Sequence, residues 1–218
     1  MKVLTQLEAG QRLARGVSLA LEETPLVIVI TPGGAAVGAE VARLLGAPLD
    51  VLTVVRLEVP GRMHSTFGAV ADGTVVLMPE RVRDLALPDD YVGSLTDLAR
   101  DEVDRITHAR RGREPAVPLS QRSVALVDDG SADLTLAVGA ATALRRAGVH
   151  RLVFAAPEAG PELVRAMERL ADELVLLELP GAGALVRDPS FTQTTEFDVH
   201  DLVSRNRRES GRVPAPAM

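Results

Sequence analysis

Residues 124–135 read Val-Ala-Leu-Val-Asp-Asp-Gly-Ser-Ala-Asp-Leu-Thr, and this stretch decides the fold. The apolar run Ser123 to Val127 has the length and composition of a strand that is buried on both faces. Asp128 and Asp129 follow it directly, and a short turn then leads into a helix of small residues from about Leu134 to Ala147. The order of strand, acidic pair, turn and helix is typical of an α/β protein with a parallel sheet.

The alternation of strand and helix continues on both sides of this stretch. The predicted strands are residues 26–30, 49–55, 123–127, 151–156 and 173–179. The helices predicted between them are residues 35–45, 134–147 and 161–170. We therefore expect a doubly wound parallel sheet of five strands, Rossmann-like, with right-handed crossovers. In such sheets ligands bind at the carboxyl ends of the strands.

Two segments lie outside this alternation. Residues 57–80 contain Pro60-Gly61 and Asp72-Gly73, so we expect a flexible loop followed by a β-hairpin that forms a small hood insertion. Residues 180–203 are expected to complete the hood, and residues 1–205 together to form one domain. The remaining residues, 206–218, are rich in arginine and proline, and we expect a disordered tail there.

The composition excludes several classes of function. The 218 residues carry a net charge of −6 and only 2% aromatic residues, which disfavours nucleic-acid binding through stacked bases. The single lysine, Lys2, is close to the terminus, and the lack of cysteine excludes disulfides and thiol catalysis. The first 16 residues predict an amphipathic helix and no signal peptide, and no apolar run is long enough to cross a membrane. A soluble cytoplasmic protein is therefore expected.

The acidic pair is the strongest candidate for chemistry. Asp128 and Asp129 lie at the expected carboxyl edge of the sheet, where carboxylates can accept hydrogen bonds from sugar hydroxyls or help to position Mg²⁺. Amides at the start of the following helix can hold a phosphate. The alternative is that the pair consists of solvated turn residues and that Ser131 or Asp133 caps the helix. The residues by themselves leave both interpretations open.

This segment resembles the signature of the type I phosphoribosyltransferase family, and in particular a bacterial branch of phosphoribosyltransferase-like proteins. The resemblance covers roughly residues 5–203. Besides residues 124–135, the motifs that carry it are Thr31-Pro32-Gly33-Gly34, residues 47–51, residues 54–56, Pro60-Gly61, residues 67–70 and residues 191–195. The order of these motifs is fairly specific, whereas no single one of them is.

The resemblance implies a ligand and a set of site residues. Members of the family bind phosphoribosyl diphosphate with Mg²⁺ and transfer phosphoribose to an acceptor, often a nucleobase. Asp128 and Asp129 are the catalytic candidates and would contact the ribose hydroxyls. Nine further residues are implied to bind the substrate: Gly33, Gly34, Arg56, Gly130, Ser131, Ala132, Asp133, Leu134 and Thr135.

These nine residues divide into three roles. Residues 130–135 would hold the 5′-phosphate, and the amides of Gly33 and Gly34 would hold the pyrophosphate. Arg56 would neutralise its charge, or would instead form a surface or interface salt bridge. Mg²⁺ would arrive largely with the diphosphate, because hard oxygen ligands suit it. No protein metal site is expected, and a homodimer is expected by default.

The sequence also departs from the family pattern. Asp133-Leu134 replaces the family's Thr-Gly in the phosphate loop, and leucine restricts the backbone where glycine would not. Each unit of negative charge about 5 Å from Asp133 costs roughly 3 kcal/mol at an effective dielectric of about 20, which is on the order of a hundredfold in affinity. The cost is smaller if Asp133 points to solvent or is neutralised by an arginine. Pro32 and Leu57 also replace two cations of the related branch.

Three functions therefore remain open. The first is an active phosphoribosyltransferase with an unusual phosphate loop. The second is a catalytically impaired relative that binds a nucleotide or a phosphorylated sugar in a regulatory role, and the third is a scaffold protein. The minor candidates are His64 as a general acid or base, Thr192 to Thr195 as part of an acceptor pocket or as a helix cap, and Phe67 or Phe191 as a base platform or as core.

Overall fold

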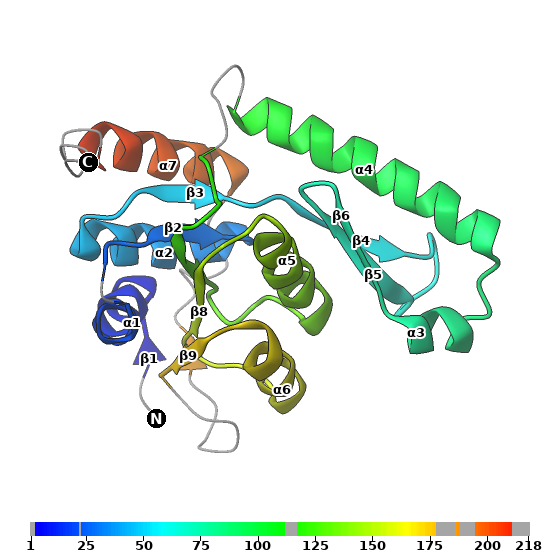
Figure 1. Cartoon of the computed structure of the whole chain (residues 1–218), viewed down its shortest axis with the longest axis horizontal. Helices are drawn as coiled ribbons and strands as arrows, with labels where there is room; N and C mark the ends of the chain where they lie inside the picture. Colours follow the sequence, from blue (N-terminus) through cyan, green and yellow to red (C-terminus); the bar gives the residue numbers. More distant parts are fainter. Residues whose placement is uncertain (1–2, 22, 112–116, 178–185, 188–194, 211–218) are drawn as a thin grey trace.

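The computed structural model describes residues 3–21, 23–111, 117–177, 186–187 and 195–210. Its centre is a parallel sheet of five strands in the order β3-β2-β7-β8-β9 (Figure 1). These strands are β2 (Leu26–Val29), β3 (Leu49–Val51), β7 (Ser123–Val127), β8 (Arg151–Ala156) and β9 (Glu173–Leu176). The predicted α/β fold class with a five-stranded parallel sheet is confirmed.

Helices cover both faces of this sheet (Figure 1). The helices on one face are α1 (Gln6–Ala20), α2 (Pro32–Leu45) and α7 (Glu196–Ser210). The helices on the other face are α5 (Leu134–Arg146) and α6 (Pro161–Leu170). A short parallel pair, β1 (Val3–Leu4) with β10 (Val186–Arg187), lies outside the main sheet.

The alternation of side chains along each central strand explains the two-sided core. In β7, Ala125 and Val127 pack toward α1 and α2, whereas Val124 and Leu126 pack toward α5 and α6. All five residues of β7 are buried. An apolar run without polar positions therefore suits a strand at the centre of a doubly covered sheet. This burial fixes the residues that follow β7 at the edge of the sheet.

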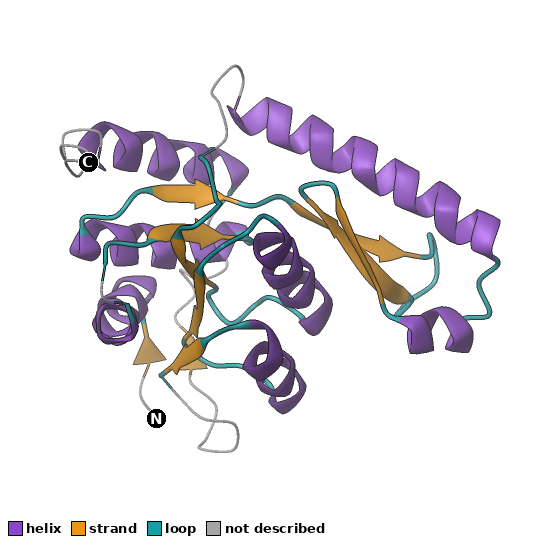
Figure 2. Cartoon of the chain, viewed as in Figure 1, coloured by secondary structure: helices purple, strands orange, loops and turns teal. Residues whose placement is uncertain are grey.

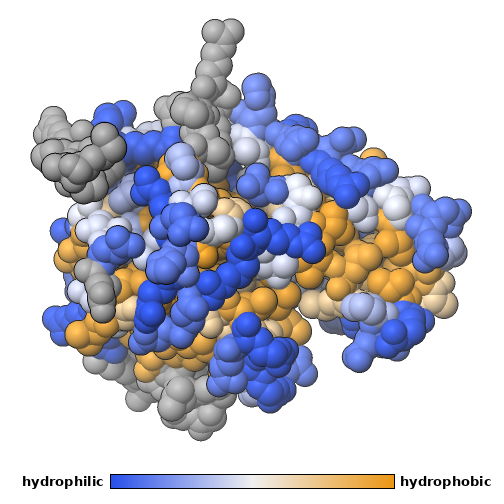
Figure 3. All heavy atoms as spheres, in the orientation of Figure 1, coloured by the Kyte–Doolittle hydropathy of each residue, from blue (hydrophilic) through white to orange (hydrophobic). Residues whose placement is uncertain are grey.

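A second, smaller sheet forms the insertion, and Figure 2 shows it separate from the central sheet. It is antiparallel, in the order β4-β5-β6, with β4 (Val54–Glu58), β5 (Thr66–Ala71) and β6 (Thr74–Leu77). One face packs on α4 (Asp89–Arg111) through a core that contains Leu57 and Phe67, while α3 (Pro79–Asp84) follows β6. Figure 3 shows apolar side chains over this sheet between the polar surfaces of α4 and α3.

The small sheet lies close to α5 because Gly139 has no side chain. A Cβ atom on Gly139 would come within 2.9 Å of Cβ of Ala69 in β5 and 3.4 Å of Cγ1 of Val54 in β4. The missing side chain thus lets the helix approach the sheet. Through this contact the small sheet is held beside the amino end of α5, where β4 can contribute Arg56 to the site.

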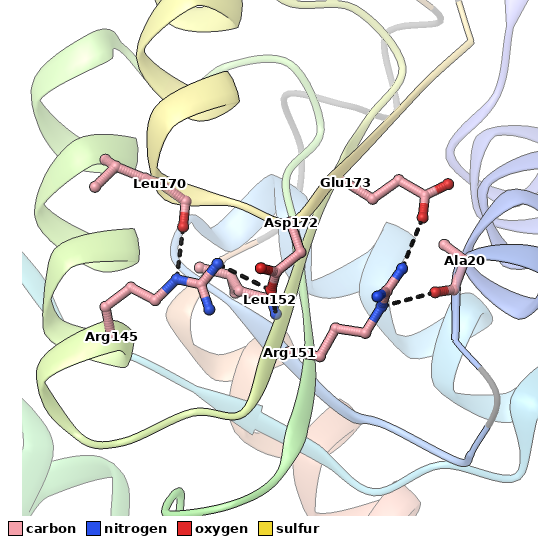
Figure 4. A network of polar contacts seen from close by, with 7 residues as sticks. All are labelled: Ala20, Arg145, Arg151, Leu152, Leu170, Asp172 and Glu173. Atoms are coloured by element: carbon pink, nitrogen blue, oxygen red, sulfur yellow. Dashed lines mark hydrogen bonds and ion pairs between the residues drawn. The ribbon is translucent and has the colours of Figure 1, made fainter.

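The amino ends of the central strands are fixed by polar contacts (Figure 4). Asp172 accepts a hydrogen bond from the Leu152 amide at 2.7 Å and pairs with Arg145 at 2.9 Å. Burial raises the pKa of Asp172, but these two partners outweigh it and lower that pKa overall. Arg151 joins the end of α1 to β9 by contacting the Ala20 carbonyl and Glu173. The carboxyl ends, where the site lies, are at the opposite edge.

The structure moves several predicted boundaries: α2 begins at Pro32 instead of residue 35, and β9 ends at Leu176. Two further corrections change the fold itself. The predicted strand 49–55 is wrong, because the chain leaves the central sheet after Leu52 and re-enters a different sheet as β4. Residues 206–210 are also not a disordered tail, since α7 continues to Ser210. Its buried Asn206 accepts from the Leu49 amide at 2.7 Å and donates to the Ala47 carbonyl at 3.0 Å. Asn206 thereby satisfies the edge of the sheet as a neighbouring strand would.

The remaining predictions concern the hairpin, the residues before α7 and the two phenylalanines. The hairpin is confirmed, and β4 extends it to three strands. Thr195 caps α7, as one of the two alternatives for residues 192–195 predicts, through hydrogen bonds with Asp198. Phe67 is fully buried and therefore belongs to the core. Phe191 and most of the segment 180–203 lie outside the described residues.

Candidate functional site

Two neighbouring strands bring the candidate residues together at the carboxyl edge of the sheet. β2 and β7 are parallel partners in which Val29 lies opposite Val127. Thr31, which follows β2, therefore lies next to Asp128 and Asp129, which follow β7. The Thr31 hydroxyl is 3.3 Å from Oδ1 of Asp128 and 3.4 Å from Oδ1 of Asp129. Segments nearly 100 residues apart in sequence thus build one polar cluster.

Both carboxylates are buried, with exposed fractions of 0% for Asp128 and 2% for Asp129. The alternative that they are solvated turn residues is therefore wrong. Buried carboxylates need hydrogen-bond donors, and the following loop supplies them. Oδ2 of Asp128 accepts from the amides of Gly130 at 2.7 Å and Ala132 at 3.2 Å. Oδ1 of Asp129 accepts from the amide of Ser131 at 3.1 Å and from its hydroxyl at 2.5 Å.

The Asp128 carboxyl group holds its proton more tightly than an ordinary aspartate. Burial raises its pKa to about 7, and the adjacent charge of Asp129 adds to the effect. The hydrogen bonds from Gly130, Ala132 and Thr31 act in the opposite direction but do not outweigh burial. The pair therefore gains or loses a proton near neutral pH, which is a property of groups that bind polar ligands or transfer protons.

The amino end of α2 contributes the second part of the site. Thr31 is the N-cap, its hydroxyl accepts from the Gly34 amide at 3.0 Å, and Pro32 occupies the first helical turn. A Cβ atom on Gly34 would lie only 2.8 Å from this hydroxyl and 3.4 Å from the Val127 carbonyl. Glycine is thus needed for α2 to approach the end of β7. The Gly33 carbonyl accepts from the Gln6 side chain at 3.4 Å.

The amino end of α5 contributes the third part. Asp133 is its N-cap, and Oδ1 accepts from the Leu136 amide at 2.9 Å. Its other oxygen, Oδ2, pairs with Nε of Arg56 from β4 at 2.7 Å. The predicted helix cap and the alternative role of Arg56 in a salt bridge are therefore both seen, in one arrangement. The Arg56 and Asp133 side chains are 42% and 45% exposed, so they lie at the mouth of the site.

Most of the predicted site residues therefore lie close together in space. Their polar side chains already contact other groups of the same chain. Thr135 is buried, and its hydroxyl points to Sδ of Met78 at 3.7 Å. Ala132 is buried and Leu134 is partly buried against the core of α5 and α6. Whether any of these residues binds a ligand stays a prediction. His64, by contrast, belongs to the exposed loop before β5, where its carbonyl accepts from Arg81.

Sequence reasoning assigned no role to Thr31. The hydroxyl caps α2 and also bridges the two acids, so it couples the first turn of the helix to the carboxylate pair. The signal was present in the sequence, because threonine followed by proline after a strand is typical of an N-cap and first helical position. The local sequence could not indicate the hydrogen bonds from Thr31 to Asp128 and Asp129.

Three further observations concern the described residues as a whole. Among the residues that the structure describes, no three His, Cys, Asp or Glu side chains form a group that could hold a metal ion. A cavity of about 190 Å³ lies elsewhere, between β3, the end of α4 and α7, and is lined in part by Asp50, Thr53 and Arg207. Within the same part of the chain, no helix is long and apolar enough to cross a membrane.

The chain resembles known proteins in both fold and sequence. A solved structure of TT1426 from Thermus thermophilus superposes with a TM-score of 0.78 at 32% identity, covering 94% of this chain and 99% of that one. Two curated Mycobacterium tuberculosis proteins, each named "Putative phosphoribosyl transferase" (Rv0571c and MT0597), are 33% identical over 217 residues. Over nearly its whole length the chain is therefore similar to proteins that are named as phosphoribosyl transferases.

The similarity to the curated proteins extends over only part of their length. The alignment covers 96% of this chain but 49% of the mycobacterial proteins, so the chain spans about half the length of these curated relatives. No family model matches the sequence. A purine phosphoribosyltransferase from Pyrococcus horikoshii superposes more loosely, with a TM-score of 0.47 at 14% identity over 86% of this chain and 93% of that one.

The residues of the loop after β7 that depart from the family signature have clear structural roles. The departures from the family signature at Asp133 and Leu134 fall at the N-cap and the first residue of α5. An aspartate is among the best N-cap residues, and a partly buried leucine adds to the core behind it. The loop is therefore well formed as protein structure, with a carboxylate at the end of the helix.

Proposed function

We propose that this chain binds a ribose-containing ligand through Asp128 and Asp129, as the ribose-binding module of a phosphoribosyltransferase-like protein. The observation that supports it is the buried carboxylate pair at the carboxyl edge of β7. Ligands bind at this edge in doubly wound sheets. The vicinal hydroxyls of a ribose donate hydrogen bonds, and carboxylates accept them. The similarity to proteins named as phosphoribosyl transferases agrees with this pairing of ligand and site.

Phosphoribosyl diphosphate with Mg²⁺ is the ligand that the family favours. Carboxylate oxygens suit Mg²⁺, so Asp128 and Asp129 fit part of a coordination shell. The diphosphate would supply the other oxygens, because the described residues offer no third carboxylate or imidazole beside the pair. When bound, Mg²⁺ would offset the charge of the diphosphate. The amides in the first turn of α2 would face the same end of the ligand.

In an active enzyme, the residues of the chain would orient the ligand for transfer. The pair Asp128 and Asp129 would fix the ribose, and phosphoribose would pass to an acceptor that the chain does not identify, with a nucleobase as the family's usual choice. Above a pH of about 7 the Asp128 carboxyl group loses its proton, so both acids can then accept hydrogen bonds from the ligand. Transfer is the first candidate activity.

A second candidate, a catalytically impaired relative that binds a ribose ligand in a regulatory role, is favoured by Asp133. Its carboxylate occupies the amino end of α5 and pairs with Arg56. Arg56 is therefore engaged in the structure rather than poised for a diphosphate. A phosphate group entering this loop would meet a carboxylate, and the pairing of that carboxylate with Arg56 and its exposure to solvent reduce the repulsion. We consider binding without efficient transfer to be the function that the geometry supports best.

Calorimetry with phosphoribosyl diphosphate and Mg²⁺ tests binding at the acidic pair. The comparison is between the wild-type chain and the Asp128→Asn/Asp129→Asn variant, with Asp72→Asn in the exposed β5–β6 turn as the matched control. We expect the control to bind like wild type and the double variant to lose at least tenfold in affinity. Equal affinity of all three proteins would show that the pair is not the ribose site. Release of pyrophosphate with a panel of nucleobases then separates transfer from binding alone.

A further inference from the structure

The amino end of α5 carries its own anion. The end of a helix with free amides attracts negative charge, and a ligand phosphate is one group that can occupy it. Here the Asp133 carboxylate already does so, with Oδ1 on the Leu136 amide at 2.9 Å. Its second oxygen pairs with Nε of Arg56 at 2.7 Å. The side chain thus makes both contacts that a terminal phosphate would seek.

The loop between β7 and α5 donates several of its hydrogen bonds to the protein itself. Three of its amides, those of Gly130, Ser131 and Ala132, donate to the carboxylates of Asp128 and Asp129. The Ser131 hydroxyl also contacts Asp129, and the Thr135 hydroxyl points to Met78. A phosphate could bind these groups only by displacing protein acceptors that are already in place, and each displaced buried carboxylate would lose a donor.

The local charge also disfavours a phosphate. Arg56 and Asp133 cancel each other, and the two acids at the end of β7 add negative charge when they are ionised. A dianion would therefore approach a surface that is neutral to acidic, whereas uncharged hydroxyl groups would find acceptors in the carboxylates. The side chain of Leu134, at the start of α5, packs against the core of α5 and α6 and offers no polar atom to a ligand.

We propose that Asp133 is a specificity-determining residue that stands in for the 5′-phosphate of the ligand. The site then selects ribosyl compounds that lack this phosphate, with ribonucleosides as the chemical class. This inference rests on the proposed binding of ribose by Asp128 and Asp129. It changes the ligand from a phosphorylated ribose to an unphosphorylated one, and it assigns Arg56 to Asp133 instead of to the ligand.

A purely structural role for Asp133 as a helix cap makes a different prediction. Asparagine and serine cap helices about as well as aspartate does, so Asp133→Asn and Asp133→Ser retain the cap and remove the charge. If Asp133 acts only as a cap, neither substitution changes the preference among ligands. If its charge excludes phosphate, both substitutions change that preference and leave the melting temperature nearly unchanged.

Calorimetry with two matched ligand pairs tests the proposal. The probes are inosine with inosine 5′-monophosphate and uridine with uridine 5′-monophosphate, so that the result does not depend on one base. The proteins are wild type, Asp133→Asn, Asp133→Ser, Arg56→Gln and Asp133→Asn/Arg56→Gln. We expect wild type to bind a nucleoside at least tenfold more tightly than its monophosphate. Both neutral variants should bind the monophosphate at least tenfold more tightly than wild type does and change nucleoside binding less than threefold.

Arg56 provides the internal control. Arg56→Gln should change monophosphate binding little in the wild-type background, where Asp133 holds the guanidinium, but should weaken it about tenfold in the Asp133→Asn background. Tighter or equal binding of the monophosphate by wild type would overturn the inference and leave the proposed ribose site standing. No binding of any probe, together with no binding of phosphoribosyl diphosphate, would overturn both.

Discussion

Two helices, α2 and α5, begin at the same edge of the sheet and are capped in chemically different ways. Thr31 caps α2 with a neutral hydroxyl, and no acidic residue lies in the first turn of that helix. Asp133 caps α5 with a carboxylate that also binds Arg56. Both threonine and aspartate are preferred N-cap residues, with aspartate the better of the two. The two caps differ in the charge that a ligand would meet at each helix end.

The acidic pair lies between these two caps and takes donors from both sides. Thr31 reaches it from α2, and the amides of Gly130 and Ala132 reach Asp128 from the loop before α5. The α2 end therefore combines a neutral cap with glycine backbone, whereas the α5 end is closed by a charge. Of the two helix ends at this edge, only that of α5 is therefore capped by a charged side chain.

The largest effect is expected from the acid that joins the two ends. The pKa of Asp128 is raised, so the folded state holds a proton that the unfolded state has released. The contribution of Asp128 to stability is therefore fully present below a pH of about 4 and is lost as the pH rises to about 7. At about 1.4 kcal/mol per pKa unit the change is several kcal/mol at most.

The Asp128→Asn variant should remove most of this dependence. Urea unfolding at pH 5 and pH 8, at constant ionic strength, measures it, and wild type should lose stability over this interval while the variant changes much less. Asp72→Asn, at an exposed position, is the matched control and should keep the wild-type slope. The same slope in all three proteins would mean that burial does not perturb Asp128.

The next effect is expected at the glycine that lets α2 approach β7. Gly34→Ala places a methyl group 2.8 Å from the Thr31 hydroxyl, so the cap must move, at a cost of about 1–3 kcal/mol. Gly93→Ala in α4 is the control, because nothing lies within 4 Å of the added atom there. It should stabilise the protein by about 0.5–1 kcal/mol. Chemical denaturation that shows the same sign for both would refute the close approach.

The caps themselves give a direct comparison of the two ends. Thr31→Ala should destabilise by about 1–2 kcal/mol, at the upper end for a cap, because it also removes a donor to two buried carboxylates. Asp133→Ala should cost about 1 kcal/mol, and Asp133→Asn close to nothing. Thermal unfolding ranks the three. An Asp133→Ala cost that exceeds that of Thr31→Ala would contradict the coupling of Thr31 to the acidic pair.

The smallest effect on stability is expected for Arg56→Gln. The ion pair with Asp133 is about half exposed, and such pairs contribute about 0–1 kcal/mol, less at high salt. Denaturation at low and at molar sodium chloride measures it. A loss above about 2 kcal/mol, well outside the range of exposed pairs, would mean that the pair holds the small sheet against α5, and its role would then be structural.

Much of the fold could be predicted from the sequence, because burial on two faces leaves a strong pattern. Residues 151–156 and 161–170 form the predicted strand and helix with the same boundaries. The break after Leu52 left no such signal, since both halves of residues 49–58 are rich in apolar and β-branched residues. The end of α7 depends on Asn206 reaching Ala47 and Leu49, a contact between distant positions that forms only in the folded chain.

The sequence indicated which residues lie at the candidate site, but not which hydrogen bonds and ion pairs they form. The position of Asp128 and Asp129 after an apolar strand indicated the edge of the sheet, and the helix after Asp133 indicated a cap. Their burial and the bridge from Thr31 depend on the pairing of β2 with β7. The pairing of Arg56 with Asp133 joins the small sheet to α5 across 77 positions, and local sequence carries no information on such a contact.

A crystal structure of the wild-type chain grown with millimolar inorganic phosphate tests the central claim most directly. The claim is that the Asp133 carboxylate occupies the amino end of α5 and that the amides of residues 130–132 already donate to Asp128 and Asp129. We predict Asp133 on the Leu136 amide and on Arg56, with no phosphate in this loop, and phosphate bound there when the Asp133→Asn variant is crystallised in the same way. A phosphate in the wild-type loop, with Asp133 displaced from α5, would contradict the account.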